Sequence, residues 1–187
     1  MRLKMTYIYL VRHCEAMGNH KRLFQGSTDC DVSDKGTRQL EYLKKRFENI
    51  HIDKNTSLFD PSCGSGNLIL NNKVRRPDQV HGIDLDPIAV MCCQFNYYLK
   101  FGDDAPEPDI KCGDFQEFVK SNDGDMKFDV VLCNPPYGAE MEIDGSVLSE
   151  VKSNDSLEFF VEHASKMATI SVFVLPETVV NIEKHKN

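Results

Sequence analysis

The tetrapeptide Asn134-Pro135-Pro136-Tyr137 carries the groups needed to hold an aromatic amine for reaction. Such an amine is a poor nucleophile because its lone pair is delocalised into the ring. An Asn side-chain carbonyl and a neighbouring backbone carbonyl can accept its N–H groups and favour the pyramidal, attacking form, and proline stiffens that geometry through its fixed φ. Tyr137 can stack on a planar target, such as a base turned out of a duplex. The alternative interpretation is a Pro-Pro strand terminator followed by a surface tyrosine.

A glycine-rich turn and two acids lie upstream of this tetrapeptide. The turn, Asp60 to Gly66, follows a predicted strand and opens a helix, so that its backbone can approach a ligand closely. Asp84 ends the next predicted strand, which suits a carboxylate that accepts hydrogen bonds from ribose hydroxyls. Asp114 follows a third strand and can accept from the amine of a nucleoside base, with Phe115 packed on its ring. The alternative is that the glycines make a tight turn and the acids cap helices.

A second group of chemically capable residues lies near the start of the chain, at Arg12 and His13. A neutral imidazole can attack phosphorus, and a guanidinium can hold a phosphate through two charge-assisted hydrogen bonds. These residues follow a strand predicted over 7–11, which we expect to be buried because it is rich in β-branched and aromatic residues. A helix predicted over 37–47, with Ser33 or Asp34 as its N-cap, comes after a polar loop.

The rest of the chain alternates strands with helices. Strands are expected at 57–59, 80–83, 109–112, 128–133 and 169–175. Helices are expected through 68–70, from Pro87 onward and over 155–167, and the second of these is predicted to bury Val90, Met91, Phe95 and Leu99. Such alternation predicts an α/β fold with a mostly parallel sheet and right-handed crossovers. Ligands bind such a sheet at the carboxyl ends of its strands, where the turn and the acids lie.

Charge and cysteine content restrict the possible partners and compartments. Residues 1–53 hold ten Lys and Arg against seven Asp and Glu, whereas the remaining residues hold twelve against twenty-two, a balance of −10. Proteins that bind nucleic acid usually have an excess of positive charge, so this chain alone would bind DNA weakly. Seven cysteines without a CxxC pair exclude a disulfide framework and a zinc ribbon, and they favour the reduced cytoplasm. No apolar run is long enough to span a membrane.

Residues 57–180 resemble the class I S-adenosylmethionine-dependent methyltransferases that act on adenine N6 in DNA. The segments that carry the resemblance are DPSCGSGNL (60–68), GIDLDP (82–87), GDF (113–115), NPPY (134–137) and VFVLP (172–176). The resemblance implies a Rossmann-like core and S-adenosylmethionine as cofactor, with no metal required. It places the cofactor against Asp60, Pro61, Cys63, Gly64, Gly66, Asp84, Asp114 and Phe115, and the target base against Asn134, Pro135 and Tyr137. Relatives with NPPY also methylate RNA or a glutamine amide, which leaves the substrate open.

The family usually has a cofactor-contacting segment before its first strand, further strands at the end of its sheet and a target-recognition domain. We expect the core in this chain to be truncated and a partner or missing segment to supply target recognition. The first piece, about residues 5–50, resembles the start of the histidine phosphatase (phosphoglycerate mutase-like) superfamily, in which His13 would take the phosphoryl group and Arg12 and Asn19 would bind it. Cys14 stands where that family usually has glycine.

The sequence thus predicts two parts, a phosphatase-like fragment at 1–53 and a methyltransferase-like core at 54–187. Three hypotheses for the whole chain follow: methyl transfer to an exocyclic amine, phosphoryl transfer through His13, or an inactive fusion of two incomplete sites. Whether the strand at 7–11 also joins the sheet of the second part is left open.

Overall fold

The computed structural model describes residues 7–12, 14–17, 31–48, 55–71, 76–121, 128–137, 140–145, 147 and 155–175. The chain forms two compact units, one of Met1–Val11 with Ile52–Leu175 and one of Arg12–His51 with Pro176–Asn187. We call the first the sheet unit and the second the smaller unit. His13 and Asn19 lie outside the described residues.

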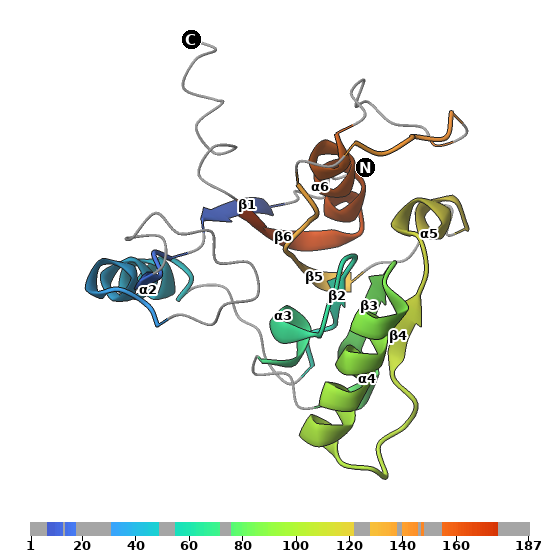
Figure 1. Cartoon of the computed structure of the whole chain (residues 1–187), viewed down its shortest axis with the longest axis horizontal. Helices are drawn as coiled ribbons and strands as arrows, with labels where there is room; N and C mark the ends of the chain where they lie inside the picture. The colour runs from blue at the N-terminus through green and yellow to red at the C-terminus, as the bar shows by residue number, and fades with distance from the viewer. Residues whose placement is uncertain are drawn as a thin grey trace, which may run out of the picture. The chain divides into compact units, whose positions relative to one another are not determined.

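The sheet unit contains, within its described residues, six strands in one sheet (Figure 1). They are β1 (Tyr7–Arg12), β2 (Leu58–Asp60), β3 (Val80–Asp84), β4 (Asp109–Cys112), β5 (Phe128–Cys133) and β6 (Ala168–Leu175). Their order across the sheet is β1-β6-β5-β2-β3-β4. Parallel pairing joins β2 to β3 and β5, β3 to β4, and β5 to β6. The predicted α/β fold with a mostly parallel sheet is therefore confirmed, and the carboxyl ends of five neighbouring strands, β6, β5, β2, β3 and β4, share one edge.

Helices cover both faces of this sheet. They are α3 (Asn67–Leu70), a short 3-10 turn η1 (Pro77–Gln79), α4 (Pro87–Phe101), α5 (Phe115–Ser121) and α6 (Ser156–Lys166). Successive residues of β2 point to opposite faces. Leu58 joins the aliphatic core beneath α3 and α4, whereas the Phe59 ring stacks on Phe118 of α5 at 5.3 Å between centroids. No helix in the described parts of the chain is long and apolar enough to cross a bilayer.

The buried face of α4 differs from the predicted one. Of the four residues predicted to be buried, only Val90 is buried. The other three are mostly exposed: Met91 by 62%, Phe95 by 64% and Leu99 by 70%. The helix contacts the sheet instead through Val90, Cys93 and Tyr97, and the Tyr97 hydroxyl donates to the Pro106 carbonyl at 2.9 Å. This helix is apolar on almost every side, so its periodicity does not identify the face that meets the sheet.

The strand at 7–11 belongs to the sheet, as β1, but the prediction that it is buried is wrong. Tyr7, Ile8 and Leu10 are each close to half exposed, and only Val11 is buried. The reason is topological, because among the described strands β1 lies at the edge of the sheet, beside β6 alone. A strand rich in apolar residues therefore need not be central.

The described part of the smaller unit is organised around α2 (Asp34–Arg46). Ser33 is its N-cap, as one of the two predicted alternatives has it, and its hydroxyl accepts from the Gly36 N–H at 3.0 Å. The same hydroxyl donates to Glu15 Oε1 at 2.8 Å, and Lys35 binds the other Glu15 oxygen at 2.9 Å. These contacts tie the segment after β1 to the start of the helix.

Two glycines of the Asp60–Gly66 turn provide a test of this packing. Gly66 has φ +88°, and a Cβ there would lie 2.6 Å from Cys93 Sγ and from Leu70 Cδ1, whereas Gly64 has φ +51° with open space around it. We expect Gly64→Ala to lower the free energy of unfolding by about 1 kcal/mol, through backbone strain alone. Gly66→Ala should cost about 1–3 kcal/mol more because it also overpacks the core. Equal losses in urea unfolding of the two variants would contradict the close packing of Cys93 and Leu70 around Gly66.

Candidate functional site

The loops that leave β2, β3, β4 and β5 open into one cavity of about 470 Å³ in the sheet unit. Residues that directly follow these strands line it, namely Pro61, Ser62, Leu85, Gly113, Asp114, Phe115, Asn134 and Pro136, together with Asp84 at the end of β3. The other lining residues come from the segment after the tetrapeptide and from α6: Glu140, Met141, Ser156 and Phe160. The arrangement brings Asp84, Asp114 and Asn134 to one place, as the parallel sheet requires.

The glycine turn is fixed to β3 by backbone hydrogen bonds. Cys63 N–H donates to the Ile83 carbonyl at 3.0 Å, and Gly66 N–H donates to the Cys63 carbonyl at 2.8 Å. The Cys63 side chain points into the core, where contact with the Cys93 thiol and burial raise the pKa of the Cys63 thiol well above its usual range. The turn therefore offers backbone rather than a reactive sulfur to a ligand.

Asp84 is held by the two loops beside it. Gly64 N–H donates to its Oδ2 at 2.8 Å, and Asp86 N–H donates to its Oδ1 at 3.0 Å. One backbone donor on each oxygen fixes the plane of the carboxylate and leaves further lone pairs on both oxygens. A pair of vicinal hydroxyls can bind to such a carboxylate with two hydrogen bonds. Asp84 is therefore both oriented and available.

Asp114 and Phe115 form the part of the cavity next to β4. One Asp114 oxygen, Oδ1, accepts from the Gln116 N–H at 2.7 Å, so the helix-capping alternative considered for this acid is realised. Asp114 is exposed and still lines the cavity. Phe115 is only 3% exposed, and its ring packs 4.8 Å from that of Phe160. Phe115 thus forms a wall of the cavity and belongs to the core behind it.

Asn134 begins the tetrapeptide at the end of β5, and its exposed side chain lies in the cavity lining. Two serine hydroxyls hold the backbone around it. Ser62 Oγ donates to the Asn134 carbonyl at 3.0 Å, and Ser156 Oγ donates to the Pro136 carbonyl at 3.1 Å. Tyr137 is 55% exposed and is not among the residues that line the cavity.

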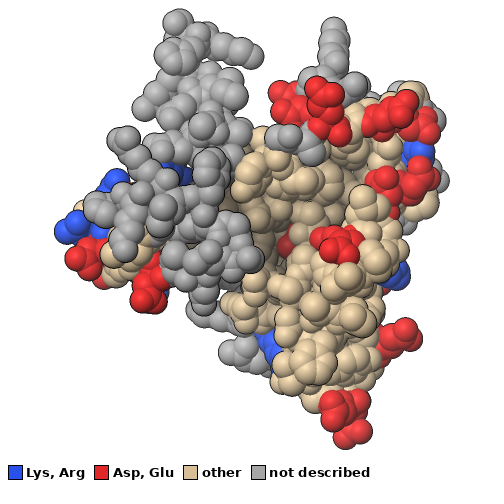
Figure 2. Space-filling model, viewed as in Figure 1, with Lys and Arg blue, Asp and Glu red and all other residues tan. Residues whose placement is uncertain are grey.

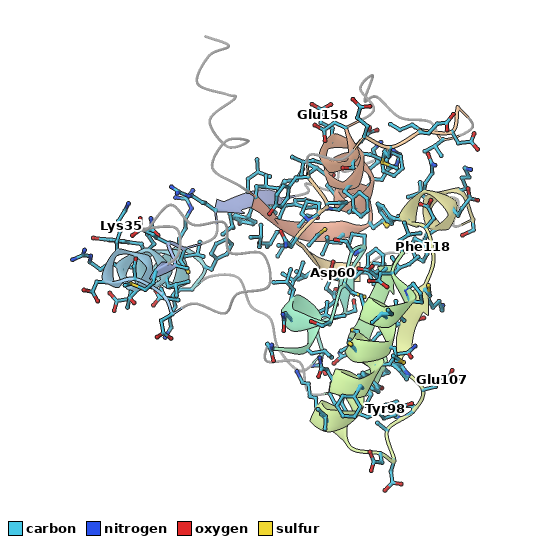
Figure 3. The ribbon with its side chains drawn as sticks, viewed as in Figure 1. Lys35, Asp60, Tyr98, Glu107, Phe118 and Glu158 are labelled. Atoms are coloured by element: carbon cyan, nitrogen blue, oxygen red, sulfur yellow. The ribbon has the colours of Figure 1, made fainter. Side chains whose placement is uncertain are left out.

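Asp60 lies beneath the cavity, at the end of the central strand β2 (labelled in Figure 3). Its side chain is 1% exposed, and Ser62 N–H donates to its Oδ1 at 3.0 Å. Burial, with a smaller contribution from the charge of Asp84, raises the pKa of the Asp60 carboxyl to about 7 despite that hydrogen bond. This carboxyl therefore keeps its proton at pH values where an ordinary aspartate has lost it.

Some predicted site residues lie apart from the cavity. Gly66 lines a second hollow, between α3 and α4, together with Asn67 and Asn96. The lining residues that sequence reasoning missed are Ser62, Glu140, Met141, Ser156 and Phe160, with the neighbours Leu85, Gly113 and Pro136. Ser62 lies within the recognised turn, so its position was the available signal. Ser156 and Phe160 lie on α6, and nothing in their local sequence indicates that this helix reaches the cavity.

Most of the charged residues visible on the sheet unit in Figure 2 are acidic. This agrees with the excess of twenty-two Asp and Glu over twelve Lys and Arg after residue 53. Within the cavity lining, Asp84, Asp114 and Glu140 are acidic, and no described lining residue is Lys or Arg. Such a cavity favours a ligand that carries positive charge over an anionic one.

A scan of family models matches residues 78–187 to the Eco57I restriction-modification methylase family. This match covers more than half of the chain, with β3 to β6 and the tetrapeptide inside it. The chain belongs to this methylase family. The resemblance to adenine N6 methyltransferases is thereby confirmed at the level of the family. A second model, of the histidine phosphatase superfamily (branch 1), matches residues 8–57, as the sequence of the first piece predicts.

Curated methylases are similar to this chain over the same region. The methylase subunit of the type I restriction enzyme MjaIX, from Methanocaldococcus jannaschii, is 32% identical over 51% of this chain and 17% of its own length. The type II methyltransferase M.CvrRI of Paramecium bursaria Chlorella virus XZ-6E is 26% identical over 72% and 34%. A tRNA1(Val) (adenine(37)-N6)-methyltransferase of Shewanella sediminis is 29% identical over 55% and 43%. The chain spans less than half of each relative.

Solved methyltransferase structures share the fold of this chain. The type I restriction-modification methyltransferase subunit from Streptococcus thermophilus superposes with a TM-score of 0.50 at 22% identity, over 67% of this chain and 29% of that subunit. The EcoKI M protein gives a TM-score of 0.50 at 13% identity, over 76% and 37%. The predicted Rossmann-like methyltransferase architecture is confirmed by these likenesses.

The buried Asp60 predicts a pH dependence of stability. Its pKa in the folded chain, about 7, is above the ordinary value of 3.8. The stability that the protonated carboxyl gives the folded chain is therefore fully present below pH 4 and is lost as the pH rises through 7. Asp60→Asn removes the titration. Relative to the wild type, we expect the variant to gain about 2–4 kcal/mol in free energy of unfolding between pH 4 and pH 8, measured by urea titration.

Asp78 provides a control of opposite sign, because the Arg76 guanidinium beside it lowers the pKa of its carboxyl. Asp78→Asn should therefore lose stability relative to the wild type as the pH rises from 2 to 5.

For Asp60, the contradicting outcome is a free energy of unfolding that changes with pH in the same way in the wild type and in Asp60→Asn. That result would show that Asp60 is not buried as an acid.

Proposed function

We propose that the sheet unit binds S-adenosylmethionine in the cavity at its strand ends and transfers a methyl group to an exocyclic amine, adenine N6 in DNA. The observation that carries the proposal is the single cavity that Asp84, Asp114 and Asn134 share above the glycine turn. Membership of a methylase family supports the reaction class.

The cofactor contacts proposed here follow the strand ends in order. Pro61 lines the cavity, and the backbone of Gly64 and Gly66 would pass close to the methionyl part, with Asp60 and Cys63 behind them. Asp84 would accept from the ribose hydroxyls, since each of its oxygens keeps a lone pair beyond its backbone donor. Asp114 would accept from the adenine amine, with Phe115 as the wall beside the ring. The acidic lining suits a cation, and the bound cofactor supplies a methyl group made electrophilic by its positive sulfonium.

The residues of the tetrapeptide would hold the target amine. The Asn134 side-chain oxygen and the Pro135 carbonyl are the two acceptors proposed for the N–H groups of the target amine. Hydrogen bonds to both acceptors would favour a pyramidal nitrogen, whose lone pair points away from the ring and toward the methyl group. The exposed Tyr137 ring is available to stack on the target base. The proposed catalytic residues are thus Asn134, Pro135 and Tyr137.

Adenine N6 is supported as the target by two kinds of relative. The Shewanella enzyme is named for adenine N6 in tRNA, and the MjaIX and M.CvrRI proteins are named as restriction or type II methylases. We favour DNA because the family model is that of a restriction-modification methylase. The acidic surface supports a partner or further segment that supplies DNA recognition. The cytoplasm is the location we propose, where the free thiols of Cys63, Cys92 and Cys133 stay reduced.

Phosphoryl transfer through His13, with Arg12 as the phosphate ligand, is the second candidate, favoured by the match of residues 8–57 to the histidine phosphatase superfamily. We keep the parts 1–53 and 54–187 as the proposed domains for these two activities. Incubation with a labelled phosphate ester tests this candidate. An acid-labile phosphate that appears on the wild type and is absent from His13→Ala supports it, and a wild type that traps no label excludes it.

Substitution of Asp84 tests cofactor binding. Hydrogen bonds to a charged group contribute about 1.5–3 kcal/mol, so Asp84→Asn should weaken S-adenosylmethionine binding about 10-fold or more in isothermal titration. Asp86→Asn is the matched control. Its side chain caps α4 by accepting from the Ile88 N–H at 2.8 Å, and asparagine preserves this bond. Equal affinities for the wild type and Asp84→Asn would contradict the proposed ribose contact.

Substitution of Asn134 tests the chemical step. We expect Asn134→Ala to lower kcat for methyl transfer to adenine-containing DNA on the order of 100-fold, because it removes an acceptor of the reacting amine. Binding of S-adenosylmethionine should stay within about 2-fold of the wild type, since a 2-fold change is less than about 0.5 kcal/mol. Asn71→Ala, which removes an exposed amide outside the cavity, is the control. A wild type that forms no N6-methyladenine would refute the proposed substrate.

A further inference from the structure

Three consecutive backbone carbonyls run along the tetrapeptide, and two of them have side-chain partners. The Asn134 carbonyl accepts from Ser62 Oγ at 3.0 Å, and the Pro136 carbonyl accepts from Ser156 Oγ at 3.1 Å. The carbonyl between them, that of Pro135, accepts no hydrogen bond from any described residue. The pattern singles out one carbonyl by engaging its two neighbours.

Ser62 is itself firmly anchored. Its N–H donates to Asp60 Oδ1 at 3.0 Å, and its hydroxyl also lies 3.4 Å from Cys133 Sγ. Asp60 and Cys133 are both buried, at 1% and 0% exposure. The serine therefore links the glycine turn after β2 to the end of β5, so that the cofactor side and the target side of the cavity share one rigid contact.

Ser156 is anchored from the other direction. It is the first residue of α6 and is 3% exposed. The N-cap of this helix, Asp155, accepts from the Leu157 N–H at 2.8 Å and so fixes the backbone on both sides of Ser156. Its hydroxyl reaches the tetrapeptide from a helix that packs on β6, far along the chain from Ser62.

We infer that Ser62 and Ser156 are positioning residues for the methyl-transfer reaction, and that they orient the Pro135 carbonyl as the backbone acceptor of the target amine. The inference rests on the proposed function. Proline fixes φ at positions 135 and 136 but leaves ψ free, and rotation about ψ swings a carbonyl away from its target. Hydrogen bonds to the carbonyls on either side restrict that rotation. A misplacement of about 1 Å at such a centre can lower the rate about 100-fold.

The kinetic test compares Ser62→Ala and Ser156→Ala with Ser165→Ala. Ser165 is a matched control because it also lies on α6 and also donates to a backbone carbonyl, that of Glu162, at 3.0 Å, outside the cavity. We expect each of the first two variants to lower kcat about 10-fold or more while KM for DNA and the affinity for S-adenosylmethionine change less than about 2-fold. Ser62→Thr, which keeps the hydroxyl, should restore most of the rate. Variants that keep the kcat of Ser165→Ala would overturn the inference.

A second measurement does not depend on activity. In a chain labelled with carbonyl ¹³C at Asn and Pro, Ser62→Ala should move the Asn134 resonance and Ser156→Ala the Pro136 resonance, with Ser165→Ala moving neither. Unchanged resonances would overturn the inference even where the wild type transfers no methyl group. A wild type that binds no S-adenosylmethionine contradicts the proposed function instead, so the two failures are distinguishable.

Discussion

The parallel register of β5, β2, β3 and β4 is the constraint on which the site depends. Each of these strands pairs with its neighbour in the same direction, so their carboxyl ends meet at one edge although the residues that follow them are far apart in sequence. Asp84, Asp114 and Asn134 enter a common cavity for this reason alone. Chemistry distributed along widely separated segments becomes local because the hydrogen-bond ladders align it.

The same edge also contains a conflict between stability and function. Asp60 ends the central strand and is almost completely buried, next to the charge of Asp84. A buried carboxyl close to another acid destabilises the fold at neutral pH, and a protein selected for stability alone would have little use for it. The benefit is positional. Asp60 accepts from the Ser62 N–H and so orients Ser62, whose hydroxyl in turn contacts the tetrapeptide. Active-site regions commonly hold such unfavourable groups.

Local sequence predicted the strands and most of the polar groups at their ends, since apolar runs stopped by Asp, Gly or Pro leave little choice of structure. It failed for α4, where residues of nearly equal hydrophobicity occupy all sides and the sheet selects Val90, Cys93 and Tyr97. It failed for the burial of β1, because edge or central position is a property of the topology. Ser156 and Phe160 reach the cavity through packing of α6, which no local pattern encodes. Local sequence thus indicated the polar residues at the strand ends, such as Asp84, Asp114 and Asn134, but not the α6 residues that pack around them.

The edge strand β1 determines whether the first part of this chain can be removed without exposing the sheet. One family model matches residues 8–57 and another matches residues 78–187, and β1 lies almost entirely within the first match. It nevertheless pairs with β6, and the border between the compact units falls within it, between Val11 and Arg12. Among the described strands, removal of residues 1–57 would leave β6 with a free edge, on which strands of other molecules can assemble. The segment similar to the histidine phosphatase superfamily thus contributes an edge strand to the sheet of the methylase part.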